Sequence, residues 1–213
     1  MYTPSSFRQE DVAVLREMMT RIGFVSLVTN TATGLLATHA PVLFDTNNGE
    51  QGTLRGHIAR ANPQWQTATE DESLAIFVGP NGYVSPQWYA AKQEHGRVVP
   101  TWNYVAVHAY GKVRFSDDRD LLLEIVTRLT EKNEAGFDQP WKVSDAPSDY
   151  VEGMLNAIVA FEMPITRIEA SWKLSQNRSE ADRMGTLEGL RSQGSAVAEE
   201  MCKVMHSPKQ EEE

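Results

Sequence analysis

Residues 24–59 read FVSLVTNTATGLLATHAPVLFDTNNGEQGTLRGHIA, and this stretch decides the fold class. Phe24–Thr29, Leu36–Phe44 and Thr53–Ile58 are each rich in β-branched and apolar residues over the length of a strand. Turn-forming residues separate these runs: a loop surrounds Gly34, and Asn48-Gly49 between apolar runs is a strong hairpin signal. The stretch therefore predicts consecutive strands joined by turns.

The same character recurs along the chain. Further strands are predicted at Leu74–Val78, Asn103–Phe115, Ile158–Met163 and Ile165–Leu174. Helices are predicted at Asp11–Arg21, from a cap at Ser116 to about Lys132, at Tyr150–Asn156, at Glu180–Arg191 and at Ala196–Met205. Because these strands do not alternate regularly with helices, we predict a mainly β, α+β fold, an antiparallel barrel with peripheral helices. We expect one domain over residues 1–208 and a disordered acidic tail at 209–213.

Residues 79–102 interrupt the strand pattern. They form an aromatic stretch punctuated by Pro80, Pro86 and Pro100, with no clear periodicity. A loop of this length inside a compact domain is usually functional or disordered. Its aromatic residues, such as Trp88 and Trp102, favour a functional loop.

Composition narrows the class of protein. The 213 residues carry a net charge of -9, which disfavours broad contact with nucleic acid but leaves room for a local cationic pocket. We expect no signal peptide, because the N-terminal residues show neither a basic nor an apolar region of that kind. No window resembles a membrane span, and Cys202 has no partner for an internal disulfide. These features predict a cytoplasmic protein with no membrane contact.

The first chemical constellation is Gly56-His57-Ile58-Ala59-Arg60-Ala61-Asn62-Pro63. Arg60 and Asn62 lie where a strand gives way to a turn, and a guanidinium beside an amide and an imidazole suits a phosphate. A surface strand end whose arginine pairs with an acid explains the same residues equally well.

Three further groups have polar or aromatic side chains suited to a ligand. Thr38 and His39 could border a planar ligand, although a histidine on an apolar strand is more often a core residue. Thr101-Trp102-Asn103-Tyr104 offers aromatic rings, amides and hydroxyls for a heterocycle pocket, or ordinary packing. Lys173 to Arg178 is polar and cationic where a strand ends and a helix begins, which fits an anion site or a helix cap.

Several familiar motifs are absent. The sequence has no dinucleotide-binding glycine motif, no P-loop and no nucleophile elbow. It also has no paired-cysteine motif and no clustered metal ligands, so we expect no metal site. No side chain stands out as a general base, and the catalytic residues stay unassigned.

Taken together, the motifs resemble one family. The matching segments, in order, are Met1–Pro4 with Phe7, Gly56–Pro63, Tyr83–Tyr89, Val99–Tyr104 and Lys173–Arg178. They look like the PaiB-type proteins, the family called FMN-binding negative transcriptional regulators, over about residues 1–192. The resemblance implies an FMN-binding split β-barrel related to pyridoxamine 5'-phosphate oxidases. It also implies a homodimer with FMN at the subunit interface.

The resemblance also implies roles for individual residues. Thr38 and His39 would face the ring or ribityl chain of FMN, Arg60 and Asn62 would take the phosphate, and Lys173 to Asn177 would close the site. The cofactor-binding residues expected on this basis are Thr38, His39, His57, Arg60, Asn62, Trp88, Thr101, Trp102, Asn103, Tyr104, Lys173, Ser175, Gln176 and Asn177.

Three functions compete at this point. The first is an FMN-binding protein with oxidoreductase activity. The second is the repressor of the family's name, although the sequence shows no helix-turn-helix and its charge gives DNA binding poor support. The third is a haem-binding or haem-degrading split barrel, in which His57 or His108 would ligate iron.

Overall fold

The computed structural model describes residues 1–206, so the predicted acidic tail at 209–213 lies outside it. Its strands are β1 (Phe24–Thr31), β2 (Gly34–Asp45), β3 (Thr53–Ala59), β4 (Ser73–Val84), β5 (Thr101–Gly111), β6 (Arg114–Ser116) and β7 (Ile158–Lys173). Its helices are η1 (Ser5–Phe7), α1 (Val12–Ile22), α2 (Gln64–Thr67), η2 (Pro86–Trp88), α3 (Ala91–Glu94), α4 (Arg119–Glu134), η3 (Val143–Asp145), α5 (Ser148–Asn156), α6 (Glu180–Ser192) and α7 (Ala196–Met205). No helix among residues 1–206 is both long and apolar enough to cross a membrane.

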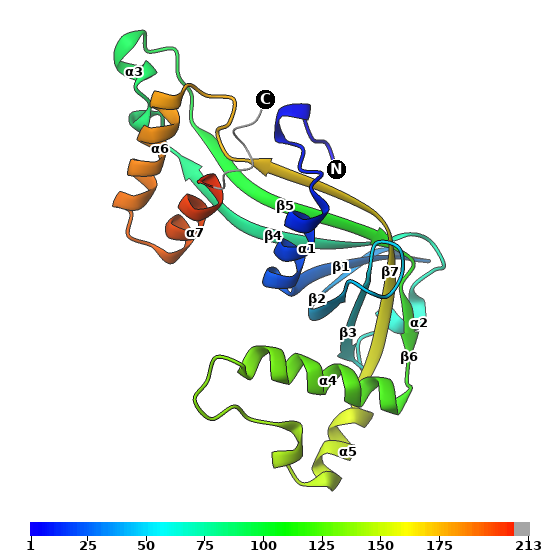
Figure 1. Ribbon diagram of the computed structural model, residues 1–213. Helices are drawn as coiled ribbons and strands as arrows, with labels where there is room; N and C mark the ends of the chain where they lie inside the picture. The colour runs from blue at the N-terminus through cyan, green and yellow to red at the C-terminus, as the bar shows by residue number, and fades with distance from the viewer. Residues whose placement is uncertain (207–213) are drawn as a thin grey trace. The chain divides into compact units, whose positions relative to one another are not determined.

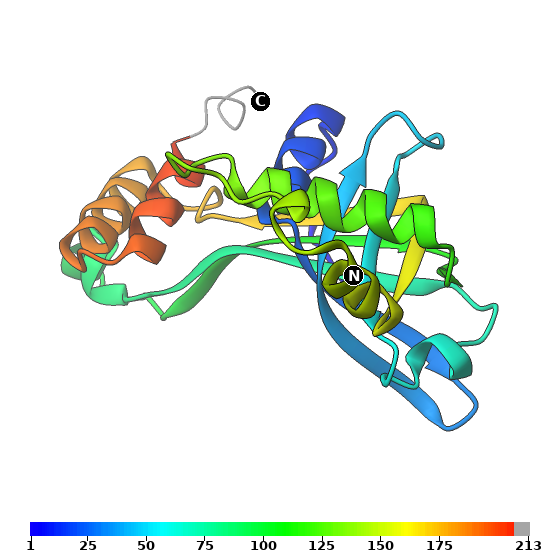
Figure 2. The same ribbon diagram turned by 90° about the horizontal axis from the view of Figure 1, so that it is seen from below.

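The predicted opening strands form as expected. β1 and β2 pair as an antiparallel hairpin in which Ser26 lies opposite His39. Gly34 follows the turn with a φ of 123°, a backbone conformation that a side chain would strain. The short helix α2 lies beside this turn (Figure 2), where the Thr69 amide donates to the Asn30 carbonyl.

The strands close into a ring. Their order is β3-β2-β1-β4-β5-β7-β6, and an additional pairing joins β3 to β7. The β1–β2, β1–β4, β2–β3, β3–β7 and β6–β7 pairs are antiparallel. The predicted antiparallel barrel with peripheral helices is therefore confirmed.

The chain forms two compact units. The first unit comprises Met1–Leu15, Val78–Val107 and the described residues from Glu169 onward; the second comprises Arg16–Phe77 and His108–Ile168. The strands β4, β5 and β7 contribute residues to both units.

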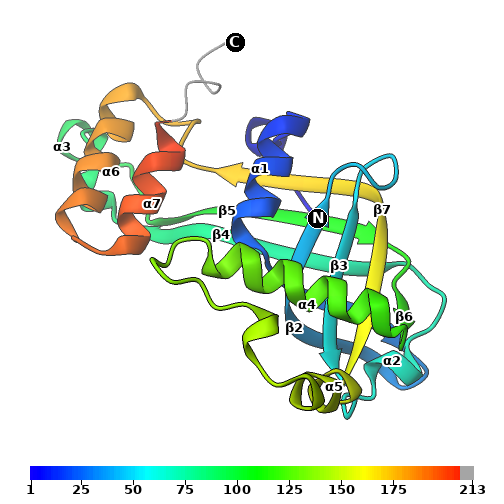
Figure 3. The same cartoon turned by 60° about the horizontal axis from the view of Figure 1, so that its bottom comes forward.

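In the second unit, α4 lies across β2 and β3 (Figure 3). Leu122, Ile125 and Leu129 recur on one helical face and pack with Leu43 and Ala160 of the sheet. Each such buried side chain contributes roughly 1.5–3 kcal/mol. The alternation of strand residues thus gives β2 and β3 an outer face, which α4 partly covers.

The start of α4 corrects a prediction. Asp118, not Ser116, caps the helix, because its Oδ1 accepts from the Leu121 amide at 3.0 Å. Ser116 is instead the last residue of β6, and its Oγ accepts from the Asp118 amide.

In the first unit, α6 and α7 lie side by side (Figure 1). Gly185 and Gly189 of α6 lie against Trp88, so closely that a Cβ on Gly189 would overlap the indole ring. This close approach explains two glycines inside a helix, where glycine is otherwise unfavourable.

Three strand predictions also differ from the structure. The strand predicted at Asn103–Phe115 forms as two, β5 (Thr101–Gly111) and β6 (Arg114–Ser116). The stretch 79–102 is not a loop throughout, because β4 continues to Val84. Gly79 permits this, since a Cβ there would meet the Val105 side chain at 3.0 Å. The two strands predicted around Pro164 form the single strand β7. Pro164 does not interrupt it, because Pro164 pairs with Thr53, the first residue of β3, where the ladder between β3 and β7 ends.

Candidate functional site

The turn after β3 places three polar residues together. The Asn62 Nδ2 donates to the Thr38 Oγ1 at 2.7 Å, and the Asn62 Oδ1 accepts from the Gln64 amide at 2.9 Å. The hydroxyl proton of Thr38 makes no hydrogen bond to another residue among 1–206. Thr38 and Asn62, predicted as ligand residues from separate motifs, are therefore neighbours.

Gln64 fixes this turn to the barrel. Its side chain is fully buried, and its Nε2 lies 3.1 Å from the Leu27 carbonyl, 3.1 Å from the Thr29 Oγ1 and 3.3 Å from the Leu36 carbonyl. A buried amide with these partners makes the turn rigid, since each bond would be lost if the turn moved.

Arg60 is held at the same turn. Its Nε donates to the Asn156 carbonyl at 2.8 Å and its Nη2 to the Ile158 carbonyl at 3.0 Å. Its guanidinium also lies over the Trp65 ring, 5.8 Å from the centroid. Within residues 1–206 the Nη1 has no hydrogen-bond partner, so part of the guanidinium remains for an anion.

His39 lies on the opposite side of β2 from Thr38, because adjacent strand residues point to opposite faces. Its Nδ1 lies 2.9 Å from the Ser26 Oγ, and its ring stacks on Phe24 with centroids 6.4 Å apart. Phe24 is 54% exposed and Leu35, on the same face of the hairpin, is 74% exposed. The side chains of Thr38 and His39 therefore cannot both face one ring.

His57 points to the face of β3 on which α4 packs. Arg55, two residues earlier on that face, reaches Glu124 of α4 and Glu162 of β7. His57 itself lines a cavity beside α4 and α5, and burial lowers the pKa of its imidazole. It is thus held apart from the Thr38–Asn62 pair by the pleat of the strand.

The remaining predicted residues lie in the first unit. The Lys173 Nζ donates to the Thr101 Oγ1 at 2.8 Å. Asn103 and Ser175 are buried and exchange hydrogen bonds, with Asn103 Nδ2 3.0 Å from the Ser175 Oγ. Ser175 has a φ of 64°, a left-handed conformation that costs a non-glycine residue energy and that these bonds hold in place. The predicted 101–104 and 173–176 motifs therefore meet.

The other residues of this unit differ in their surroundings. Trp102 is half exposed, donates to the Asn81 Oδ1 at 3.2 Å and meets Tyr83 edge-on. The Tyr104 hydroxyl accepts from the Ser171 Oγ at 3.4 Å. The Gln176 Oε1 accepts from the Leu174 amide, Asn177 is exposed, and Trp88 packs against α6.

The comparisons with known proteins identify the family. A family model described as "Putative FMN-binding domain" matches residues 1–167. The chain belongs to this family. It is 35% identical over 207 residues to "Protease synthase and sporulation protein PAI 2" of Bacillus subtilis (strain 168), which covers 96% of both chains. It is also 35% identical over 190 residues to an uncharacterized protein of Emericella nidulans, covering 74% of this chain and 76% of that protein.

These matches confirm the predicted PaiB-type family and its cofactor, FMN. Solved structures agree on the fold. The flavocytochrome Anf3 from Azotobacter vinelandii has a TM-score of 0.56 at 10% identity, over 78% of this chain and 69% of its own. A conserved hypothetical protein from Mycobacterium tuberculosis has a TM-score of 0.54 at 11% identity, over 87% of this chain and 93% of its own. At these identities the likeness shows the split-barrel fold alone.

The residues at the turn fit the phosphate of FMN. The free donors of Thr38 and Arg60 are half-buried and are fixed by Asn62 and by backbone carbonyls. An anion site requires hydrogen-bond donors that are already in position before the ligand binds.

Sequence reasoning missed one group of residues. Trp141, Tyr150 and Met154 line the cavity beside His57, although they lie far from it in the sequence. The available signal was the pair of aromatic residues Phe137 and Trp141 around Pro140 in a segment between two helices.

Proposed function

We propose that this chain binds FMN, forms a homodimer and acts as an FMN-dependent oxidoreductase. The observation that carries the proposal is the rigid turn at Arg60 and Asn62, where Arg60 and the neighbouring Thr38 keep free donors that suit a phosphate. When bound, FMN supplies the hydride- or electron-transfer chemistry. The chain's own residues bind and orient it: Thr38 and Arg60 would donate to the phosphate, and Asn62 would hold Thr38 in position.

The homodimer is supported by the outer face of the β1–β2 hairpin. Phe24, His39 and Leu35 lie on this face and are exposed, and Ile76 of the adjoining β4 lies opposite Ser26. A sheet face with exposed aromatic and aliphatic residues gains stability when a second copy covers it.

The dimer is tested by adding charge to this face. Phe24→Asp should convert the dimer to a monomer in sedimentation or light scattering. Phe137→Asp is the matched control, because Phe137 is also exposed but lies elsewhere in the same unit. A wild-type chain that sediments as a monomer would overturn the dimer.

The cofactor site is tested by absorbance. The purified protein should show flavin bands or gain them with added FMN. Thr38→Val keeps the shape of the side chain and removes its hydroxyl, so it should weaken FMN binding about tenfold or more. Thr33→Val, in the exposed hairpin turn, should not. Unchanged affinity in Thr38→Val would refute the phosphate assignment, whereas a protein that never takes up FMN would refute the function.

A regulatory role is the second candidate, and the resemblance to the family called FMN-binding negative transcriptional regulators favours it. The net charge of -9 gives direct DNA contact little support, so regulation through a partner or a metabolite fits better. A gel-shift titration with the promoter of its own operon discriminates, and binding only at very low salt would count against DNA recognition. The haem alternative predicts a Soret band on haem addition that a His57 or His108 substitution removes.

A further inference from the structure

The surface around α4 and α5, in the second unit, exposes large apolar side chains. Trp141 is 47% exposed, Tyr150 61% and Met154 50%, and all three line one open hollow of about 230 Å³. Val151 lines both this hollow and a groove of about 660 Å³ between α4 and α5, so the two are continuous. Exposed aromatic side chains gathered in this way mark a surface that another molecule covers.

The segment that carries Trp141 is held in place by two carboxylates. The Trp141 amide donates to the Glu134 carboxylate at 3.0 Å, and the Lys142 amide donates to the Asp145 carboxylate at 2.9 Å. Because these bonds fix the backbone on both sides of the indole ring, little conformational freedom is lost when a partner covers it. Tryptophan and tyrosine are also the residues that most often carry the binding energy of protein interfaces.

Acidic side chains surround this apolar surface. Residues 117–154 contain ten carboxylates and four cationic side chains, so they carry -6 of the chain's net charge of -9. Two of the four cations are already paired, Arg119 with Glu152 and Arg128 with Glu124. The surface therefore attracts a positively charged partner and repels a negatively charged one.

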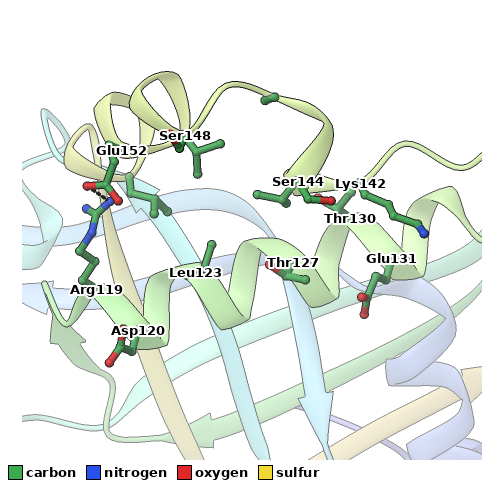
Figure 4. A pocket seen from close by; sticks show the side chains of 14 residues that line it. Arg119, Asp120, Leu123, Thr127, Thr130, Glu131, Lys142, Ser144, Ser148 and Glu152 are labelled. Atoms are coloured by element: carbon green, nitrogen blue, oxygen red, sulfur yellow. Dashed lines mark ion pairs between the residues drawn. The ribbon is translucent and has the colours of Figure 1, made fainter.

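Figure 4 shows how the charges lie along the groove. Arg119 and Glu152 form an ion pair at one end, and Glu131 lies at the other end with Lys142. Leu123, which is 41% exposed, lies between the two ends. An apolar centre with a charged rim is the usual arrangement of a protein-binding surface.

The shape and charge of this surface favour a polypeptide over other occupants. A hollow whose walls are about half exposed leaves a small molecule largely in water, whereas ligand pockets enclose most of their ligand. Nucleic acids and anionic membranes carry negative charge, which the acidic rim repels. A polypeptide segment can cover a wide, shallow surface and bring lysine or arginine side chains to that rim.

We propose that the surface between α4 and α5 docks a cationic segment of a partner protein. One bulky apolar side chain of this segment fills the hollow between Trp141, Tyr150 and Met154, and its lysine or arginine side chains pair with rim carboxylates such as Glu131. The proposal goes beyond FMN binding, because it assigns a protein-binding surface to residues that the turn at Arg60 does not use.

The test uses the full chain with FMN bound and three rhodamine-labelled synthetic peptides of equal length, followed by fluorescence anisotropy. The first peptide has lysines around a single tryptophan, the second has serine in place of that tryptophan, and the third has glutamates in place of the lysines. The first should bind in the micromolar range, and the second about fivefold or more weaker, because it lacks the apolar anchor. The third has the wrong charge and should not bind measurably.

A pair of tyrosine variants locates the apolar contact. Tyr150→Ser should weaken binding of the first peptide about fivefold or more. Tyr2→Ser is the matched control, because it removes another exposed tyrosine, from the first unit, and it should leave binding unchanged. Both side chains are exposed, so neither change is expected to unfold the chain.

A pair of charge variants tests the rim. Glu131→Gln combined with Asp149→Asn should weaken binding of the first peptide about threefold, as expected for two exposed ion pairs. Glu50→Gln combined with Glu70→Gln removes the same charge from exposed positions elsewhere and should leave binding unchanged.

The proposal is overturned if the first peptide fails to bind the wild-type chain, if the three peptides bind alike, or if Tyr150→Ser and Tyr2→Ser bind it equally. Sedimentation of Tyr150→Asp tests a second copy of this chain as the occupant. A dimer that this substitution converts to a monomer would make the surface an interface between copies and would also overturn the proposal. Flavin absorbance is followed in the same samples. Release of FMN by the first peptide would assign the surface to the flavin site, so the docking proposal would fail while FMN binding stands.

Discussion

Replacing Gln64 by leucine tests whether the hydrogen bonds of its buried side chain anchor the turn at Arg60 and Asn62. The Gln64 side chain is fully buried, and its Nε2 reaches the Thr29 hydroxyl and the carbonyls of Leu27 and Leu36. Leucine has a similar volume, so the change removes hydrogen bonds without opening a large cavity.

The magnitude follows from these contacts. The amide carries two hydrogens, so at most two of its three contacts are full hydrogen bonds. Losing both hydrogen bonds and leaving their buried acceptors without a partner costs about 3 kcal/mol. The Gln64 Oε1 is itself buried without a partner among residues 1–206, and its removal returns about 1 kcal/mol. The net loss is about 2 kcal/mol, or a melting temperature lower by roughly 4–8 °C.

Urea unfolding followed by circular dichroism measures this difference, with an unchanged slope showing that the compactness of the chain is unaltered. Gln66→Leu is the matched control, since Gln66 lies in the same short helix but is exposed, and it should change stability by less than about 0.5 kcal/mol. A Gln64→Leu protein as stable as the wild type would show that the buried amide does not anchor the turn.

Three further predictions concern packing, pH and the thiol. Gly189→Ala should destabilise the protein by about 1–3 kcal/mol in urea unfolding, because its Cβ would overlap Trp88. Gly153→Ala in α5, where a Cβ meets nothing, should be neutral or stabilising, and equal effects would contradict the packing argument. Burial lowers the pKa of His57 below 6.5 in the folded chain, so the unfolded chain takes up a proton at a higher pH than the folded chain does. The free energy of unfolding therefore decreases as the pH falls from 6.5 toward the folded pKa. Urea unfolding at pH 7.5 and 5.5 should therefore show a larger loss for the wild type than for His57→Leu, and equal losses would refute this. Burial also raises the pKa of the Cys202 thiol, so its alkylation at pH 8 should be much slower in the native than in the unfolded chain; equal rates would show that it is accessible.

The fold was largely predictable because its signals are local. Runs of β-branched and apolar residues, with turn residues between them, predicted all three strands in 24–59, and a helix was predicted where α4 forms. The cap of α4 was misplaced by two residues, and two other errors occurred where a distant contact decided the outcome. Pro164 does not end β7, because it lies where β3 begins, and Gly79 lets β4 continue against Val105.

The candidate site was predictable only in part. The Gly56–Pro63 motif placed Arg60 and Asn62 at a strand end, but the contact of Asn62 with Thr38 depends on the pairing of β2 with β3. The roles assigned to single residues at the flavin stay predictions.

The sequence by itself determined the family, the cofactor class and the positions of most strands, because ordered motifs and neighbouring residues carry that information. Only the tertiary structure decided which side chains meet. The pleat of β2 sends Thr38 and His39 to opposite faces, and the packing of α4 and α5 over the sheet places Trp141 and His57 in the lining of one pocket. Such contacts depend on the closure of the sheet and on helix packing over it, and no local pattern in the sequence encodes either.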